Sequence, residues 1–309
     1  MSTSRNPLQA LERRFDEGQI TKRDYIRGMY DLHERLFDYS SFIAGRNVDR
    51  ITVTAEHVLV TTKQNVTMIC SPGDWRITPV EILNFGDYEM TETKLLLSFL
   101  NPDSVVIDIG ANTGWYSITL GRAVPHGRVL AFEPIPQTLL GLRKNLALNG
   151  MENVQVFENG LSDEEKELVF YFHPRVSGAT SARNLLEDDE KIEVHARVRR
   201  MDDVLAEEQR IDLIKCDVEG AEIYALRGGL ETIRRTKPVL FVEMLRKWTA
   251  KYDYHPNEII GLLADAGYRC FAIDGGALRP LARMEENTVA TNFIFLHTQR
   301  HAEHIHRLA

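Results

Sequence analysis

The sequence predicts an α/β protein whose core is a doubly wound, mainly parallel β-sheet. Beyond Pro102, short and continuously apolar runs alternate with helical patterns of about 10 to 15 residues. Such strands are typical of sheets covered on both faces, and the helices between them supply the crossovers that parallel strands require. With 43% hydrophobic and 27% charged residues in a chain of 309, the composition excludes a disordered, fibrous or disulfide-scaffold class.

The N-terminal part of the chain follows a different pattern. Residues 1–45 have apolar side chains at helical spacing, and residues 51–70 contain β-branched runs that predict a small antiparallel meander. Residues 90–100 predict a further helix. We therefore expect a helical and β-meander cap over residues 1–90 and a catalytic domain over residues 91–309. The apolar face of the N-terminal helices is expected to be either a lid over the site or a homodimer surface.

The remaining elements follow in order along the chain. Strands are expected at residues 105–109, 128–133, 154–157, 211–217, 239–243 and 268–273, and helices at 115–123, 137–148, 222–235 and 258–266. The run 292–297 is expected to add an edge strand. An excursion at 168–200 has β-type stretches of its own around a polar loop at 177–183.

Charge and cysteine content restrict the location and the partners. Lys and Arg number 37 against 45 Asp and Glu, a formal charge of −8, so nucleic acid is not an expected partner. Cys70, Cys216 and Cys270 lack the CxxC spacing of a zinc site and fit a reducing compartment. No apolar run approaches the roughly 18 residues of a membrane span. We therefore expect a cytoplasmic protein with no membrane partner.

Acidic residues end four of the predicted strands, namely Asp108, Glu133, Asp217 and Glu243. In an open parallel sheet the ligand lies outside the carboxyl ends of the strands. Carboxylates in that position lose hydration unless a ligand, a metal or backbone donors satisfy them. These four positions therefore predict the binding site, with helix capping or lysine pairing as the alternative explanation.

The turn after the first of these strands reads Asp108-Ile-Gly-Ala-Asn-Thr-Gly114. Gly110 and Gly114 allow a tight turn and a close approach of the backbone to a ligand. Glu133 follows Asp108 by 25 residues, where an acid can accept both ribose hydroxyls of a nucleoside. The dinucleotide pattern GxGxxG is not met, because its second and third glycine positions hold Asn112 and a tryptophan. A nicotinamide-dependent oxidoreductase is therefore disfavoured.

These motifs resemble those of the FkbM family of S-adenosylmethionine-dependent methyltransferases. The segments that resemble the family are Gly86–Glu89, Val106–Ser117, Phe132–Pro134, Ser177–Ser181, Asp212–Glu222 and Lys237–Glu243. The resemblance implies a class I (Rossmann-like) methyltransferase fold with S-adenosyl-L-methionine as cofactor. It also implies O-methylation of a hydroxyl on a small molecule, sugar or natural-product intermediate. It does not extend to residues 1–80 or beyond residue 275, so it does not identify the acceptor.

The resemblance and the chemistry of the cofactor together assign a binding set. Glu133 is expected to accept the ribose hydroxyls, and the turn from Asp108 to Gly114 to hold the amino-acid end. Residues 159–162 are expected to hold the adenine, and Glu89 to close over the cofactor. The complete set is Glu89, Asp108, Gly110, Asn112, Gly114, Glu133, Pro134, Gly160, Leu161, Ser162 and Asp217.

The acceptor side must remove a proton, because an alkyl hydroxyl is a poor nucleophile at neutral pH. Asp217, Glu219 and Glu243 are expected to converge there, either as a general base or as ligands of a Mg²⁺ ion that lowers the pKa of the hydroxyl. His255 is a further candidate base. The candidate acceptor-binding residues are Tyr88, Ser177, Thr180 and Ser181.

Three alternatives stay open at this point. The same cofactor can donate a different alkyl group or cyclise on the same fold, a nicotinamide oxidoreductase is a different class, and a scaffold of this kind can bind without catalysis. The acids at the strand ends favour an enzyme over a binding protein.

Overall fold

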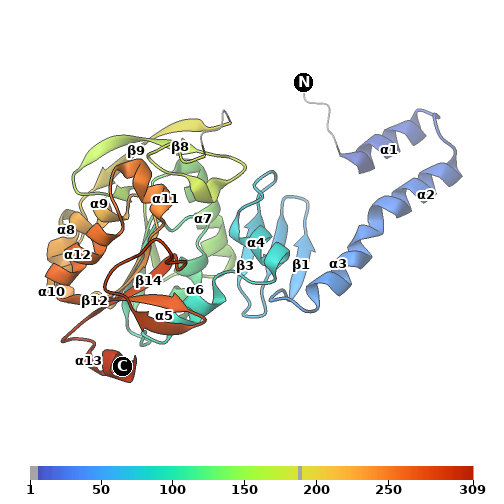
Figure 1. The fold of residues 1–309 in the computed structure, drawn as a ribbon. Coiled ribbons are helices and arrows are strands. Elements are labelled where there is room, and N and C mark those ends of the chain that lie inside the picture. Colours follow the sequence, from blue (N-terminus) through green and yellow to red (C-terminus); the bar gives the residue numbers. More distant parts are fainter. Residues whose placement is uncertain (1–5, 187–189, 309) are drawn as a thin grey trace.

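The computed structural model describes residues 6–186 and 190–308, and an eight-stranded sheet forms its core (Figure 1). The strands are β4 (Val105–Ile109), β5 (Arg128–Phe132), β6 (Val154–Phe157), β10 (Leu213–Cys216), β11 (Val239–Glu243), β12 (Tyr268–Asp274), β13 (Ala277–Pro280) and β14 (Asn292–His297). Their order across the sheet is β13-β12-β14-β11-β10-β4-β5-β6. The strands from β6 to β11 pair in parallel, which confirms the predicted doubly wound sheet.

The last strand lies in a different place from the one we expected. We expected residues 292–297 at the edge of the sheet, and this was wrong, because β14 lies between β11 and β12 and is antiparallel to both. Phe295 pairs with Leu240 on one side and with Cys270 on the other. The physical reason is burial: residues 293–296 are almost completely buried, and a strand that is apolar on both faces belongs in the interior of a sheet.

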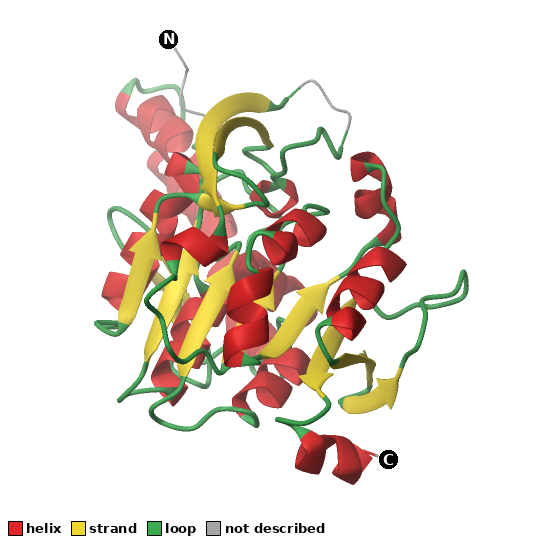
Figure 2. Cartoon of the chain, turned by 90° about the vertical axis from the view of Figure 1, so that its left-hand side faces the viewer, coloured by secondary structure: helices red, strands yellow, loops and turns green. Residues whose placement is uncertain are grey.

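Helices cover both faces of the sheet (Figure 2). On one face lie α5 (Met90–Leu97), α6 (Trp115–Ala123) and α7 (Pro136–Leu148), and on the other lie α8 (Met201–Val204), α9 (Glu222–Arg227), α10 (Leu230–Thr236) and α12 (Asn257–Asp265). Neighbouring residues of β4 serve the two cores alternately, since Val106 packs with the first group and Ile107 with the second. The sheet is thus buried on both sides, as its continuously apolar strands predict.

The single helix predicted at 222–235 is in fact two helices, α9 and α10, which Gly228 and Gly229 separate. A Cβ atom on Gly228 would lie 1.9 Å from the backbone oxygen of Ser162, and one on Gly229 would lie 2.7 Å from the sulfur of Met201. These glycines allow the chain to turn where it packs closely on two other segments. The expectation of one continuous helix was therefore wrong.

The excursion between the third and fourth core strands belongs to a separate small sheet. This sheet consists of β7 (Gly160–Leu161), β8 (Lys166–Phe172) and β9 (Ile192–Arg199) in the order β7-β9-β8. The β-type stretches at 168–200 predict β8 and β9, whereas β7 lies before them and was not predicted. The short 3-10 helix η1 (Ser177–Ala179) lies in the polar loop after β8. Residues Ser177–Thr180 of this loop lie beside the carboxyl ends of the core strands, where they share one cavity with Glu133, Asp217 and Glu243.

The predicted antiparallel meander is confirmed as β1 (Arg50–Val53), β2 (Val58–Thr61) and β3 (Thr67–Cys70). It packs on α7, where the side-chain oxygens of Asn145 and Asn149 accept hydrogen bonds from the backbone of Ile69 and Thr67 at 3.0 Å each. The helix α4 (Thr78–Phe85) follows it and was not predicted. Further short elements are α11 (Arg246–Thr249), η2 (Ala250–Tyr252) and α13 (Ala302–Leu308).

Three N-terminal helices extend away from this body (Figure 1). They are α1 (Pro7–Asp16), α2 (Lys22–His33) and α3 (Arg35–Ile43), and we call residues 7–43 the arm. None of the residues in these three helices is buried. Among the described helices of the chain, none is both long and apolar enough to cross a bilayer.

Candidate functional site

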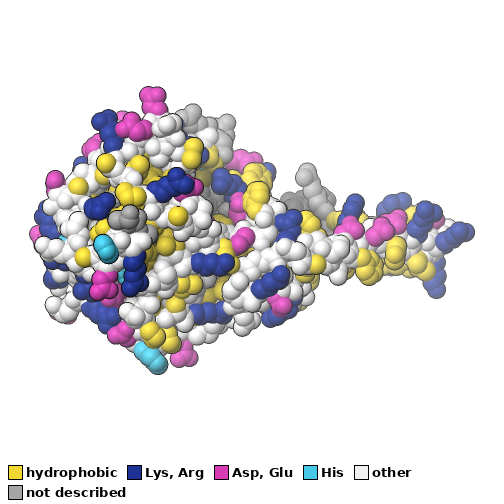
Figure 3. Space-filling view, turned by 60° about the horizontal axis from the view of Figure 1, so that its bottom comes forward, with side chains coloured by type: hydrophobic (Ala, Val, Ile, Leu, Met, Phe, Trp, Pro, Cys, Tyr) yellow, Lys and Arg dark blue, Asp and Glu magenta, His cyan; other side chains and the backbone are white. Residues whose placement is uncertain are grey.

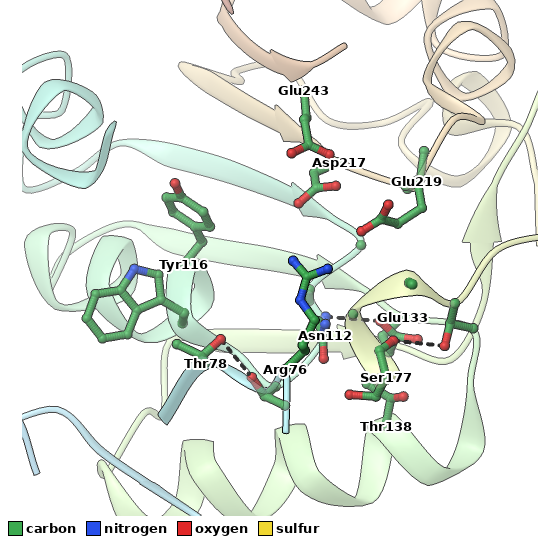
Figure 4. Close-up of a pocket in the computed structure, with 18 of the residues that line it drawn as sticks. Arg76, Thr78, Asn112, Tyr116, Glu133, Thr138, Ser177, Asp217, Glu219 and Glu243 are labelled. Atoms are coloured by element: carbon green, nitrogen blue, oxygen red, sulfur yellow. Dashed lines mark hydrogen bonds between the residues drawn. The ribbon is translucent and has the colours of Figure 1, made fainter. Parts of the chain in front are cut away.

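A cavity of about 460 Å³ opens at the carboxyl ends of β4, β5, β10 and β11 (Figure 4). That volume lies in the range of small-molecule sites. The predicted site residues that line it are Tyr88, Glu89, Gly110, Asn112, Glu133, Pro134, Ser177, Thr180, Asp217, Glu219 and Glu243. Three of the four strand-end acids, Glu133, Asp217 and Glu243, therefore meet in one place, together with the turn after β4 and the loop after β8.

The other predicted residues lie elsewhere. Gly160, Leu161 and Ser162 are buried beside β9 and do not line the cavity, and neither do Asp108, Gly114 and Ser181. His255 is exposed and lies in a separate surface hollow with Arg246 and Arg283. Its backbone N–H and ring nitrogen take part in local bonds at the start of α12. None of the arm residues lines the cavity.

The glycines of the β4 turn are required by the chain itself. Gly110 and Gly114 have φ values of 75° and 94°, in the left-handed region. A Cβ atom on Gly110 would lie 2.0 Å from the backbone oxygen of Asp217, and one on Gly114 would lie 2.7 Å from Leu142. The N–H groups of Gly110 and Ala111 both donate to the carbonyl oxygen of Phe132 at 3.0 Å. The turn is thus fixed against β5 and β10 before any ligand binds.

Asp108 lies beneath this turn rather than in the cavity wall. It is fully buried and accepts a hydrogen bond from the Ser117 hydroxyl at 2.6 Å. Its other oxygen lies 3.4 Å from the ammonium of Lys215. Asp108 therefore supports the turn from below, through partners that the chain supplies.

Glu133 forms the wall at the end of β5. Its carboxylate accepts hydrogen bonds from the backbone N–H groups of Asn112 and Ile135, at 3.0 Å each. Burial raises its pKa from 4.5 to about 7, against the opposing effect of these two donors. The side-chain oxygen of Asn112 is buried beside it with no hydrogen-bond partner among the described residues. A buried acceptor without a donor indicates a place where a ligand N–H or O–H group belongs.

Three carboxylates form the opposite wall. One oxygen atom from each of Asp217, Glu219 and Glu243 lies within 4.8 Å of the other two, and Figure 4 shows the groups pointing toward one another. The pKa values of Glu219 and Glu243 are raised well above 4.5. Burial is the largest cause, and the negative charge of Asp217 is the second. Neither Glu219 nor Glu243 has a side-chain hydrogen bond or ion pair within the described chain. Such a group can share protons or hold a cation.

The backbone around Glu219 is fixed in an uncommon conformation. Its φ is 53°, which is rare for a residue other than glycine. The Ser181 hydroxyl donates to its carbonyl oxygen at 2.8 Å, and the buried carboxylate of Glu222 accepts from the N–H groups of Val218 and Gly220 at 3.1 and 2.9 Å. Ser181, predicted to contact an acceptor, therefore lies behind the wall. These bonds hold the strained backbone in place, and a carboxylate oxygen of Glu219 lies within 4.8 Å of one of Asp217.

Lys215 connects the two walls and was missed by the sequence analysis. It is buried, and its ammonium donates to the carbonyl oxygen of Gly110 at 2.7 Å and lies 3.6 Å from Asp217. Burial alone would lower its pKa, but Asp217, Asp108 and Glu89 together raise it above the ordinary value. A lysine inside an apolar strand requires buried partners, and that signal was present in the sequence.

Glu89 approaches the cavity from the segment before α5. It has a φ of 43°, and its carboxylate accepts a hydrogen bond from the Tyr116 hydroxyl at 2.6 Å. Burial raises its pKa from 4.5 to about 7, an effect that the Tyr116 bond opposes. Arg76, Thr78, Thr138, Lys247 and Trp248 also line the cavity and were not predicted, since they come from helices and loops with no motif of their own.

Comparison with known families gives a direct match. Residues 108–270 fit the family model described as the methyltransferase FkbM domain. The chain belongs to the FkbM methyltransferase family. This confirms the family that the strand-end motifs resemble.

Curated relatives of this family match over less than half of the chain. "Methyltransferase 1" of Beauveria bassiana is 33% identical over 41% of this chain and 58% of its own length. "2-O-methyltransferase NoeI" of Sinorhizobium fredii is 29% identical over 44% and 61%, and "31-O-demethyl-FK506 methyltransferase FkbM" of Streptomyces tacrolimicus is 30% identical over 42% and 60%. The matches thus span 58 to 61% of the length of these relatives.

Among solved structures, a TehB-like SAM-dependent methyltransferase from Corynebacterium glutamicum is similar over 70% of this chain and 92% of that one. The TM-score is 0.41 and the sequence identity is 12%.

Proposed function

We propose that this protein is an S-adenosylmethionine-dependent O-methyltransferase that acts on a hydroxyl of a small molecule, sugar or natural-product intermediate. The observation on which the proposal rests is the pairing of two different walls across one cavity. On one wall Glu133 and the unpartnered oxygen of Asn112 offer acceptors, and on the other three carboxylates face one another. Membership of the FkbM family supports the same reaction class.

The residues present suit the cofactor. Glu133 keeps free lone pairs on both oxygens after accepting one backbone N–H on each, so it can accept the two ribose hydroxyls. Asn112 adds a further acceptor, and Asp217 and Glu89 supply negative charge for a cationic ligand. When bound, S-adenosylmethionine supplies an electrophilic methyl group on a sulfonium.

The wall formed by Asp217, Glu219 and Glu243 has the properties of a general base. An acceptor hydroxyl must lose its proton as it attacks, and a carboxylate with a raised pKa takes that proton more readily than an ordinary one. Glu219 and Glu243 have raised pKa values, and Lys215 holds a positive charge beside Asp217. We assign the proton to one of these two glutamates.

The names of two relatives support oxygen as the acceptor atom. NoeI is called a 2-O-methyltransferase, and FkbM is named for a 31-O-demethyl substrate. The acceptor of the present chain is proposed only as a hydroxyl compound.

Calorimetric titration of the purified chain with S-adenosylmethionine tests the cofactor, and a folded chain that binds none of it would contradict the proposal. The product then tests the reaction. S-adenosylhomocysteine supports methyl transfer, whereas methylthioadenosine would favour the transfer of another alkyl group or cyclisation. Competition by NADH in the same titration would favour the nicotinamide alternative.

The same three carboxylates offer the oxygen ligands that Mg²⁺ prefers, so a metal-assisted reaction is the alternative to a glutamate base. Turnover that survives EDTA supports the base. Turnover lost in EDTA and restored by Mg²⁺ would replace it with the metal.

We also propose a cytoplasmic location, since Cys70, Cys216 and Cys270 are all free thiols in the structure. Cell fractionation with an antibody against the chain tests this, and recovery from the culture medium would contradict it.

A further inference from the structure

The arm has little internal support. Its helices contain 10, 12 and 9 residues and no buried side chain. Isolated helices shorter than about 12 to 15 residues are marginal in water. α1 supports one side of α2, where Phe15 stacks on Tyr25 at 4.6 Å and Leu11 lies against Gly28. At the other end of the arm, Ile43 packs against the core of the body and Arg46 lies over the Phe42 ring, so the uncovered part is the outer side of α2 and the first half of α3.

Large apolar side chains are exposed along another side of α2 and α3. Ile26, Tyr30 and Phe37 are 58%, 56% and 66% exposed. Together with His33 they are spaced i, i+4, i+7 and i+11, and only Glu34, itself in helical conformation, separates the two helices. This is the spacing of the seam in a two-stranded coiled coil. Figure 3 shows hydrophobic side chains gathered along one side of the arm.

The charges beside this seam are segregated along the helix. The basic residues Lys22, Arg23 and Arg27 lie in the first half of α2, and the acidic residues Asp31 and Glu34 lie at its end. None of these five forms an ion pair within the described chain. Two neighbouring residues whose charge is opposite to that of their half already have partners. Asp24, in the basic half, accepts a hydrogen bond from Thr21, and Arg35, next to the acidic residues, forms an ion pair with Asp38. The unpaired charges therefore give the arm a basic half and an acidic half.

We propose that the arm joins two copies of this chain, with the two seams antiparallel. In that orientation Ile26 of one copy faces Phe37 of the other, and Tyr30 faces His33. Arg27 of one copy then lies near Glu34 of the other, because each directly follows a seam residue on the same flank, whereas a parallel pair would bring Arg27 near Lys22 of the other copy. A lipid surface suits the arm less well, because its acidic half would face the same anionic headgroups as its basic half.

The first experiment measures the mass of the full chain by analytical ultracentrifugation. The wild-type chain is expected to be a dimer, and Ile26→Glu/Tyr30→Glu is expected to be a monomer, because both copies then bury charges in the seam. The matched control is Leu140→Glu on α7, which changes a side chain that is 63% exposed outside the arm and leaves the dimer intact. Circular dichroism and cofactor titration show that each variant keeps the folded body.

The second experiment tests the orientation. Arg27→Glu is expected to weaken the dimer by at least about tenfold, because two attractive contacts become repulsive. The double variant Arg27→Glu/Glu34→Arg restores opposite charges across an antiparallel pair and is expected to recover the wild-type dissociation constant. A parallel pair would not recover.

Each other result overturns the proposal. If the wild-type chain is monomeric at its highest soluble concentration, the arm does not join two copies. A monomer that sediments with phosphatidylserine vesicles assigns the arm to a lipid surface. A dimer that survives Ile26→Glu/Tyr30→Glu uses another surface, and failure of the double charge reversal rejects the antiparallel arrangement.

Discussion

The two walls of the cavity both present carboxylates, but they surround them differently. Glu133 is fixed by two backbone N–H donors and lies beside an unpartnered amide oxygen. Glu219 and Glu243 have no such donors and face Asp217 and each other. Burial raises the pKa in both places. At Glu133 the repulsion from Asp108 is a minor cause that Lys215 opposes, whereas for Glu219 and Glu243 the repulsion from Asp217 is the largest cause after burial. The first arrangement suits binding, and the second suits proton transfer.

The largest expected effect is on the wall of three carboxylates, Asp217, Glu219 and Glu243, which we call the acid wall. The variant Glu219→Gln/Glu243→Gln keeps the size of both side chains and removes both proposed bases. We expect kcat/KM to fall by about 10²- to 10⁴-fold, the usual contribution of a general base. Cofactor affinity should stay close to wild type, because the wall formed by Glu133 and Asn112, which we call the binding wall, is unchanged. Initial rates with calorimetric binding constants check both quantities.

The control for that variant is Glu158→Gln, an exposed glutamate paired with Arg143 away from the cavity. It should match the wild type in rate. A double variant that loses less than about tenfold in kcat/KM would show that neither glutamate is the base.

The next effect is on the binding wall. Glu133→Gln replaces a charged acceptor, and a hydrogen bond to a charged group contributes about 1.5–3 kcal/mol. We expect the dissociation constant of S-adenosylmethionine to rise by about 10- to 100-fold, with kcat at saturation little changed. Titration calorimetry measures the first and saturation kinetics the second. A loss of kcat with unchanged affinity would reverse the roles of the two walls.

A smaller effect concerns pH. Burial raises the pKa of Glu133 to about 7 from 4.5, so between these values the folded chain holds a proton that the unfolded chain has released. Folding stability without ligand should therefore decrease as the pH rises from 4.5 to 7. Ribose hydroxyls donate to the ionised carboxylate, so affinity for S-adenosylmethionine should increase by up to about tenfold from pH 6 to pH 8. The same titration with Glu133→Gln should keep only the smaller slope that Glu89 contributes, since its pKa is also raised to about 7, and an undiminished slope would assign the effect to another group.

The smallest effect comes from Arg76. Burial, Asp217 and Glu222 raise the pKa of Glu219, and the charge of Arg76 opposes them. The Arg76 side chain is 63% exposed, so solvent weakens its effect. We expect Arg76→Gln to move the kinetic pKa of kcat/KM upward by less than about one unit. A downward shift in the pH profile would show that Arg76 does not act on the acid wall through its charge.

Much of the site follows from the sequence, because the position of an acid at the end of a buried strand is a local feature. Glu133, Asp217 and Glu243 meet at one edge of the sheet for that reason alone. Arg76 and Lys247 were not predicted, since their approach depends on how the cap and the segment after β11 fold back over the cavity. The roles assigned to Gly160, Leu161, Ser162 and His255 stay predictions, and the structure places these residues outside the cavity.

The fold shows the same difference between local features, which can be predicted, and contacts between distant segments, which cannot. Element type follows from apolar periodicity, and the core strands β4, β5, β6, β10 and β11 lie where the sequence places them. The order of the sheet and the break at Gly228 depend instead on contacts between distant segments. The position of β14 is one example, because β11 and β12 are both its neighbours and both precede it in the chain. Periodicity within one segment contains no information on such partners.

The interior position of β14 has a consequence for how the chain is made. β11 and β12 are synthesised first, yet each has one edge that pairs with residues 292–297. A ribosome adds residues from the N-terminus, so the nascent sheet has two open edges until residues 292–297 have emerged. A truncation before Asn292 would therefore split the sheet beside Glu243, its pairing partner, and expose two strands that can aggregate.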